Sequence, residues 1–386
     1  MKTLVKQAIE RRFPGTLQRL RDLMKAPTFR YRHHRRPSSL DAKGGYASGE
    51  SADDRRLIDR LIESYALRSE RPTGQWADIF LDRHADISAA FAGRDRPRIE
   101  EILRNPASSD IFFGFDSTGK SLRAAGLRIE DRRAPRLALD GLATFADALG
   151  ARTIELPENY YFWRVNRLDA DEVLDQIDGA LGFRIPVPNP FPAEYGLVSG
   201  RGIVSFRVPQ AMYQAWRVAR LVKGIARPKV LEIGGGLGRT AFYARQFGIR
   251  DYTIVDIPVS SLAQGYFLGR TLGEESVALF GEAAAEDRVK IVPPGFFLDG
   301  TERYDLVVNV DSLTEIGRAA ADQYWSAIKT RADKFLSINH EANEFTVAQL
   351  IRDAGNARSS RMPYWLRRGF VEEVVEFAHD DSGKAP

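Results

Sequence analysis

The sequence predicts an α/β protein with a doubly wound, mostly parallel sheet and a mainly helical accessory domain before it. After about residue 201, short apolar segments alternate with helical patterns, which is typical of βαβ units in a parallel sheet. Before residue 183, apolar residues recur at helical spacing between glycine and proline breakers. A chain of 386 residues is long enough for two such domains.

We expect a helical accessory domain over residues 1–182, which covers the site and selects the substrate, a proline-rich connector over 183–200, and a cofactor-binding domain over 201–386. The connector contains the run Ile185–Pro192, in which every second residue is proline. Proline removes a backbone donor and fixes φ, so this run is neither a helix interior nor a central strand. An extended path between two domains is the expected structure.

The expected strands are short apolar runs in the part of the chain after the connector. They are Val230–Ile233, Tyr252–Val255, Val289–Val292, Tyr304–Val310 and Lys334–Asn339, with Phe370–Phe377 as an edge strand. A helix opened by Pro209 leads into the first of them. Ligands of such sheets bind outside the carboxyl ends of the strands, so the residues at these ends are the site candidates.

The turn after the first expected strand carries four glycines within five positions. A strand, a glycine turn and a helix N-terminus together can hold a nucleoside-type cofactor. A dinucleotide fingerprint would need a third glycine at the position of Arg239. Glu232, two residues before the first glycine, favours a ligand that carries an ammonium group and would repel a pyrophosphate. We therefore predict S-adenosylmethionine as the cofactor, bound by Glu232, Gly234, Gly235, Gly236 and Gly238; the alternative is a tight turn alone.

The ends of two further strands complete the predicted cofactor site. Asp256 ends the second strand, eighteen residues after Gly238, where its carboxylate can accept hydrogen bonds from a ribose diol. Ile257 follows and is expected to pack on the adenine face. Asn309, near the end of the fourth strand, is expected beside the cofactor.

His340, at the end of the fifth strand, is the candidate general base, with Asp311 or Glu315 as its partner. Histidine suits this role because its pKa lies near neutral pH and a carboxylate can tune it. Three alternatives remain open: Ser312-x-x-Glu315 is also a capping box, His340 also fits a loop position bonded to the backbone, and Asp311 with His340 could ligate a metal. The spacing lacks the tighter pattern of a dedicated metal site, so no metal is predicted.

The residue types that the chain lacks limit which chemical group can accept a methyl group from the predicted cofactor. The chain has no cysteine, which excludes the thiol nucleophile needed to methylate cytosine at C5, and also excludes a disulfide scaffold. The Asn/Asp-Pro-Pro-aromatic run of amino-methylating nucleic-acid enzymes is absent from the end of the fourth strand, and the Pro293–Pro294 pair follows the third strand instead. An oxygen acceptor on a small molecule or glycan is therefore expected.

Three motifs resemble those of a bacterial family of sugar O-methyltransferases. They are Glu232–Thr240, Asp251–Pro258 and Asn309–Ile316, and the resemblance covers about residues 196–345. It implies a class I, Rossmann-like methyltransferase that transfers a methyl group from S-adenosylmethionine to a hydroxyl of a sugar, as a nucleotide-sugar or polysaccharide precursor. Such enzymes serve the biosynthesis of envelope or secreted polysaccharides.

The charge pattern leaves two rival functions open. Net charge is only +4, and the basic excess gathers in Arg30–Arg36, next to glycines and serines that favour a solvated loop. An RNA 2′-O-methyltransferase would use this basic segment, and a non-catalytic scaffold would bind the cofactor alone; nucleic acid is not the expected partner. The N-terminus lacks a signal-peptide core and no apolar run could span a bilayer, so a cytoplasmic location is expected.

Overall fold

The computed structural model describes residues 54–114, 130–152, 168–192, 194, 196–283, 287–353 and 358–378. The basic segment Arg30–Arg36 lies outside these residues. Among the described helices, none has the length and apolar character needed to cross a bilayer.

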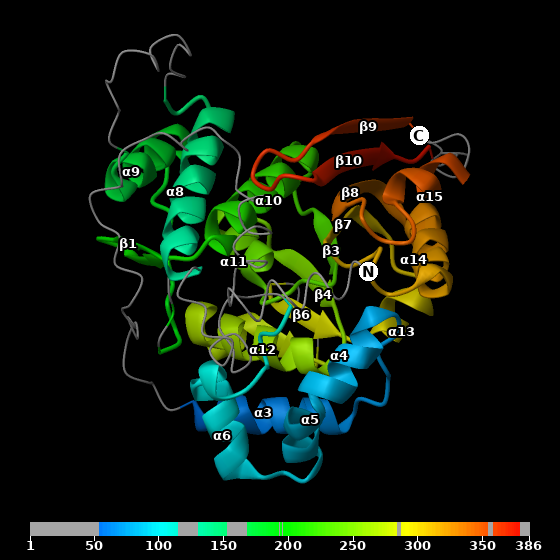
Figure 1. Cartoon of the computed structure of the whole chain (residues 1–386). Coiled ribbons are helices and arrows are strands. Elements are labelled where there is room, and N and C mark those ends of the chain that lie inside the picture. Colours follow the sequence, from blue (N-terminus) through cyan, green and yellow to red (C-terminus); the bar gives the residue numbers. More distant parts are fainter. Residues whose placement is uncertain are drawn as a thin grey trace, which may run out of the picture.

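An eight-stranded sheet forms the centre of the molecule (Figure 1). In spatial order its strands are β5 (Val277–Leu279), β6 (Val289–Val292), β4 (Asp251–Val255), β3 (Lys229–Ile233), β7 (Tyr304–Val310), β8 (Ala332–His340), β10 (Phe370–Glu376) and β9 (Arg358–Pro363). Every pairing from β5 to β8 is parallel, and β10 runs antiparallel to both of its neighbours. The predicted α/β class with a mostly parallel sheet is confirmed.

The sheet differs from the prediction at both margins. β5 and β9 were not expected, because the first is only three residues long and the second is mostly exposed, without an apolar pattern. The expectation that Phe370–Phe377 forms an edge strand is wrong, since β10 lies between β8 and β9. Its acids gave the appearance of an exposed strand, yet Glu372 is buried against Tyr213 and Arg217, and Glu373 pairs with Arg361.

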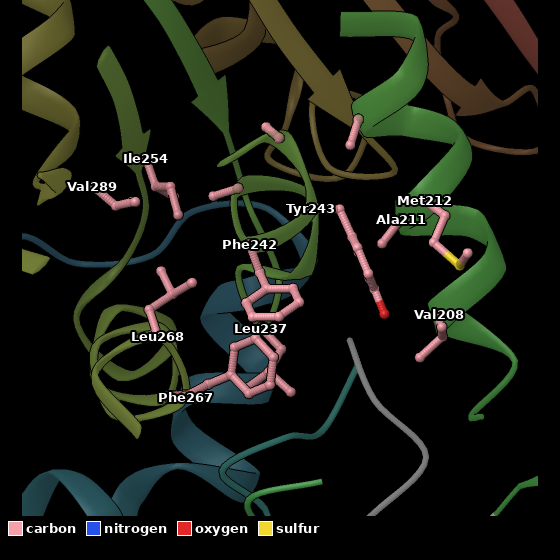
Figure 2. Packing of buried hydrophobic residues seen from close by; sticks show 14 of the residues in the cluster. Val208, Ala211, Met212, Leu237, Phe242, Tyr243, Ile254, Phe267, Leu268 and Val289 are labelled. Atoms are coloured by element: carbon pink, nitrogen blue, oxygen red, sulfur yellow. The ribbon is translucent and has the colours of Figure 1, made fainter. Parts of the chain in front are cut away.

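Alternation along the strands gives the sheet two apolar faces, as a doubly wound fold requires. Val230 and Ile254 point into one cluster, and Leu231 and Val255 point into the other. The first face is covered by α10 (Arg207–Leu221), α11 (Arg239–Gln246) and α12 (Pro258–Leu272), and the second by α13 (Pro294–Leu298), α14 (Arg318–Arg331) and α15 (Val347–Asp353). Figure 2 shows the first cluster, where Phe242 and Tyr243 of α11 lie between α12 and α10.

The part of the chain before residue 183 is helical in its described residues, as predicted. Its elements are α3 (Arg55–Ala66), α4 (Gln75–Arg83), α5 (Ala85–Ala92), α6 (Arg96–Arg104), the 3-10 turn η2 (Pro106–Ser108), α8 (Glu130–Ala148) and α9 (Ala170–Leu181). α3 lies along α12 (Figure 1), where a Cβ built on Gly269 would be 2.7 Å from Leu57 and one on Gly265 would be 2.7 Å from Leu61. These two glycines therefore let the helices approach closely.

The proline-rich stretch over 183–200 is packed rather than exposed. Ile185, Val187 and Phe191 are buried, and the Phe191 ring contacts Phe112 at 4.9 Å and Phe267 at 6.3 Å between centroids. The stretch leads into a short hairpin of β1 (Leu197–Ser199) and β2 (Gly202–Val204). Elsewhere in the chain, a 3-10 turn, η4 (Glu274–Ser276), follows α12. The proposed boundary between the two domains therefore runs through one shared hydrophobic core.

Replacing Phe191 with Ala should lower the free energy of unfolding by about 3–5 kcal/mol, because it removes a buried ring that joins the helical part to α12. Urea denaturation measures this change. The matched control is Phe296→Ala, whose side chain is 41% exposed and whose loss should cost about 0.5 kcal/mol or less. Equal effects of the two substitutions would show that the stretch is not part of the core.

Candidate cofactor-binding and active site

A cavity of about 320 Å³ opens at the carboxyl ends of β3, β4 and β7. Its walls are the glycine turn, the strand ends, one side of α10 and the segment Glu70–Trp76 that leads into α4. Of the predicted site residues, the cavity is lined by Glu232, Gly234, Gly235, Gly236, Asp256, Ile257 and Asp311. Gly238, Asn309, Glu315 and His340 lie outside the lining set.

The glycine turn is shaped by contacts that leave no room for side chains. Gly234 has a φ of 71°, and a Cβ on it would lie 2.2 Å from the Ser312 hydroxyl. A Cβ on Gly235 would lie 2.7 Å from Ile254. Gly238, with a φ of 84°, instead precedes α11 and serves the turn itself. Arg239, at the position where a dinucleotide fingerprint needs glycine, places its guanidinium over the Phe267 ring.

Glu232 lies at the base of this turn and is only 1% exposed. Burial raises the pKa of its carboxyl to about 7, and the groups that lower this pKa are the neutral hydroxyls of Tyr252 and Thr240. The Tyr252 hydroxyl donates to Oε2 at 3.0 Å. A buried carboxyl held only by hydroxyls would gain most from a cationic ligand in the cavity.

Asp256 follows β4 and is fixed in its orientation by two donors. Its Oδ1 accepts the Ile257 amide at 2.8 Å, and its Oδ2 accepts the Gln264 side-chain amide at 2.5 Å. The same Gln264 amide donates to the Gly236 carbonyl at 3.0 Å, so it connects the glycine turn with this carboxylate. Burial raises the pKa of Asp256 to about 6.

The stretch Arg68–Trp76 of the helical part, here called the accessory segment, also reaches the Asp256 end of the cavity. The sequence did not reveal this contact. The Arg68 side chain is 2% exposed and donates to the Asp256 carbonyl at 2.5 Å and to the Ser261 hydroxyl at 3.2 Å. Its partner in an ion pair is Glu70, which lines the cavity. No motif marks an arginine in the polar run Arg68–Arg71, so only the tertiary contact identifies it.

Asn309, predicted as a cofactor ligand, uses its polar atoms on the protein. It is fully buried, and its Nδ2 donates to the Ile233 carbonyl at 2.9 Å and to the Ser312 hydroxyl at 2.6 Å. Its Oδ1 accepts the Leu313 amide and the Asn339 side-chain amide. Asn309 therefore holds the ends of β3, β7 and β8 together. Its four hydrogen bonds use the polar atoms of the side chain, which leaves none facing the cavity.

The three predicted catalytic residues come together at one side of the cavity. His340 Nε2 lies 3.6 Å from Asp311 Oδ1 and 3.9 Å from Glu315 Oε1. Asp311 has a left-handed backbone with φ of 54°, an uncommon conformation for a residue other than glycine. Its Oδ2 accepts Arg367 Nη1 at 2.7 Å, whereas its Oδ1 is buried without a hydrogen-bond partner among the described residues.

Glu315 is an acid with a raised pKa and no capping role. Burial, followed by the charge of Asp311, raises the pKa of its carboxyl to about 7. Its Oε2 accepts Trp76 Nε1 at 3.0 Å. The capping-box alternative is wrong, because α14 begins at Arg318 after Gly317 and has no side-chain cap.

One hydrogen bond of His340 indicates its tautomer. Nδ1 accepts the Ala342 backbone amide at 3.2 Å, so the neutral ring carries its hydrogen on Nε2, which faces the two carboxylates. Ligand atoms of Asp311, Glu315 and His340 lie within 4.8 Å of one another, a spacing that could hold a metal ion. In this tautomer, however, Nε2 has no lone pair for a cation or for an acceptor's proton.

Comparison with known proteins finds the chain similar to solved methyltransferase structures. The glycopeptide N-methyltransferase MtfA is 16% identical over 44% of this chain and 90% of its own, with a TM-score of 0.33. The ribosomal protein L11 methylase from Lactobacillus delbrueckii subsp. bulgaricus is 12% identical over 45% and 80%, with a TM-score of 0.33. The methyltransferase domain of a bacterial Hen1 protein is 11% identical over 42% and 97%, with a TM-score of 0.32. No family model and no curated protein sequence matches the chain.

Substituting Glu232 with Gln should stabilise the protein at pH 8 by up to about 3 kcal/mol, since each pKa unit is worth about 1.4 kcal/mol. The pKa is raised in the folded state, from 4.5 to about 7, so the cost to folding grows as the pH rises from 4.5 to 7 and is complete above 7. The gain should shrink as the pH falls through 7 and vanish below 4.5. Urea denaturation between pH 4 and 8 measures it, with exposed Glu344→Gln as the control that stays unchanged. A gain independent of pH would contradict this origin.

Proposed function

We propose that this protein is an S-adenosylmethionine-dependent O-methyltransferase that acts on a hydroxyl of a sugar, presented as a nucleotide-sugar or glycan precursor. The observation that supports it most is one cavity lined by the glycine turn, the buried Glu232, Asp256 and Asp311, whose Oδ1 has no hydrogen-bond partner among the described residues. The first three suit a cationic nucleoside, and the last suits an acceptor that must lose a proton.

The residues of the cavity fit the cofactor group by group. Glu232, whose pKa is raised by burial, would bind the ammonium group of the methionine part. The turn Gly234–Gly236 lines the cavity without side chains, so its backbone would lie against the ligand. Asp256 keeps lone pairs on both oxygens for the ribose diol, and Ile257 lines the cavity beside it, where the adenine would pack.

The reaction needs alignment and a place for one proton. The cofactor supplies a methyl group on a sulfonium, whose sulfur keeps the electron pair of the broken carbon–sulfur bond as the acceptor oxygen bonds to the methyl carbon. The chain's share is to orient the acceptor in line and to take its proton. Asp311 Oδ1 receives that proton in this proposal. The Nε2–H of His340 faces both Asp311 and Glu315, here called the acid pair, and would stabilise their negative charge.

The acceptor assignment rests on the resemblance to sugar O-methyltransferases and on the lack of a thiol nucleophile. The rival RNA 2′-O-methyltransferase depends on Arg30–Arg36, outside the described residues. Radiolabelled methyl transfer to a panel of nucleotide-sugars and to RNA separates the two. A protein that binds the cofactor without any transfer would be the scaffold.

Asp256→Asn should weaken binding of S-adenosylmethionine about 10- to 100-fold, because a hydrogen bond to a charged group is worth about 1.5–3 kcal/mol. Isothermal titration calorimetry measures the affinity, and NAD should not bind. Asp353→Asn, a change at a side chain 61% exposed, serves as the control. Failure of the wild-type protein to bind S-adenosylmethionine would refute the proposed function.

The affinity for S-adenosylmethionine should also rise between pH 5.5 and 7. A bound ammonium lowers the pKa of Glu232 from about 7, so binding below pH 7 releases a proton. Calorimetry in buffers of different ionisation enthalpy counts that proton. The Glu232→Gln variant should release less of it and lose most of the pH dependence.

Asp311→Asn should lower kcat by about 10²–10⁴-fold, the usual contribution of a positioned base, whereas His340→Ala should lower kcat less. Turnover of the wild type should rise with pH around 7. The pKa of Glu315 is about 7, and its ionisation leaves both carboxylates of the acid pair, Asp311 and Glu315, charged and ready to take a proton. Glu315→Gln should remove this step. A larger loss in His340→Ala than in Asp311→Asn would restore the histidine as the base.

A further inference from the structure

We propose that the indole of Trp76 is the platform on which the pyranose ring of the acceptor stacks. The inference rests on the proposed function and adds a specificity-determining residue from the accessory segment. Trp76 lies in the first turn of α4 and lines the same cavity as Asp311 and Ser312.

The indole is fixed at two edges. Its Nε1–H donates to Glu315 Oε2 at 3.0 Å, which links it to the acid pair. On the six-membered ring, Cη2 would lie only 2.9 Å from a Cβ on Gly114, a position with φ of 91° where only glycine leaves room. Because the hydrogen bond and the close packing against Gly114 fix the indole, it could bind one face of a sugar ring without first being ordered.

The segment before the indole is tied to the turn that carries the acids. The Gln75 amide donates to the Glu315 carbonyl at 3.1 Å, and the Thr73 hydroxyl donates to the Ile316 carbonyl at 2.8 Å. Gly74 packs so closely that a Cβ would lie 2.3 Å from the same Glu315 carbonyl. Trp76 and the acid pair therefore form one unit, which would place a stacked ring against Asp311.

The chemistry around Trp76 favours a hexose over a nucleobase. An aromatic face contacts the carbon-bound hydrogens of a pyranose, and nearby carboxylates such as Asp311 and Glu70 accept hydrogen bonds from its hydroxyls. Arg71, exposed on the same segment, also lines the cavity and could meet the diphosphate of a nucleotide-sugar.

The test compares the binding of UDP-glucose, UDP-galactose and UDP-N-acetylglucosamine by calorimetry, with S-adenosylhomocysteine at saturation. Trp76→Ala should weaken hexose binding about 5- to 150-fold, by analogy with aromatic stacking of about 1–3 kcal/mol. Trp76→Phe keeps a stacking face but loses the Nε1–H, so its affinity should stay within about threefold of the wild type. The control is Trp365→Ala, at a side chain 58% exposed and outside the cavity lining.

The outcomes separate the two proposals. Unchanged hexose affinity in Trp76→Ala, with S-adenosylhomocysteine still bound, would overturn the stacking role alone, and so would a Trp76→Phe variant as weak as Trp76→Ala. Binding of a ribonucleotide oligomer, and of none of the three hexoses, would also overturn it in favour of RNA. If the wild-type protein does not bind S-adenosylhomocysteine, the proposed function itself is refuted. Melting temperatures of all variants establish that each is folded.

Discussion

The Ile233 carbonyl, at the carboxyl end of β3, accepts hydrogen bonds from both the Asn309 amide and the Ser312 hydroxyl. Because Asn309 also accepts from Asn339 of β8, three strand ends are held in one position relative to each other. The glycine turn leaves β3 at this point, and the turn with Asp311 leaves β7 beside it. The distance between the two halves of the cavity is therefore set by buried amides that face away from it.

The acids in and beside the cavity share an electrostatic condition. Burial raises the pKa of Glu232, Asp256 and Glu315 toward neutrality, and each is held by hydrogen-bond donors in the described residues. Such carboxyl groups are costly to ionise when the site is empty. A bound cation would stabilise their charge, and a proton taken from the acceptor would neutralise it. A ligand with an ammonium and a sulfonium, and an acceptor that loses a proton, would relieve this cost in two different places.

The accessory segment completes the cavity rather than merely covering it. Arg68 reaches the carbonyl of Asp256 at one end, and Trp76 reaches the carboxylate of Glu315 at the other. The helix before this segment, α3, shares a hydrophobic core with α12 through Leu57 and Leu61, and Phe191 belongs to the same core. Changes in the packing of the helical part are thus expected to reach the cavity through this segment.

The sequence alone determined the α/β class, the parallel strands and the glycine turn, because these depend on local periodicity and on glycine spacing. It also brought His340, Asp311 and Glu315 to one sheet edge, since carboxyl ends of parallel strands converge. Only the tertiary structure decided which atoms each of them faces. The hydrogen on His340 Nε2 is set by the Ala342 amide, and the burial of Asn309 is set by β3 and β8. Likewise Arg68 and Trp76 act from far upstream, and contacts between distant segments leave no periodic trace in the chain.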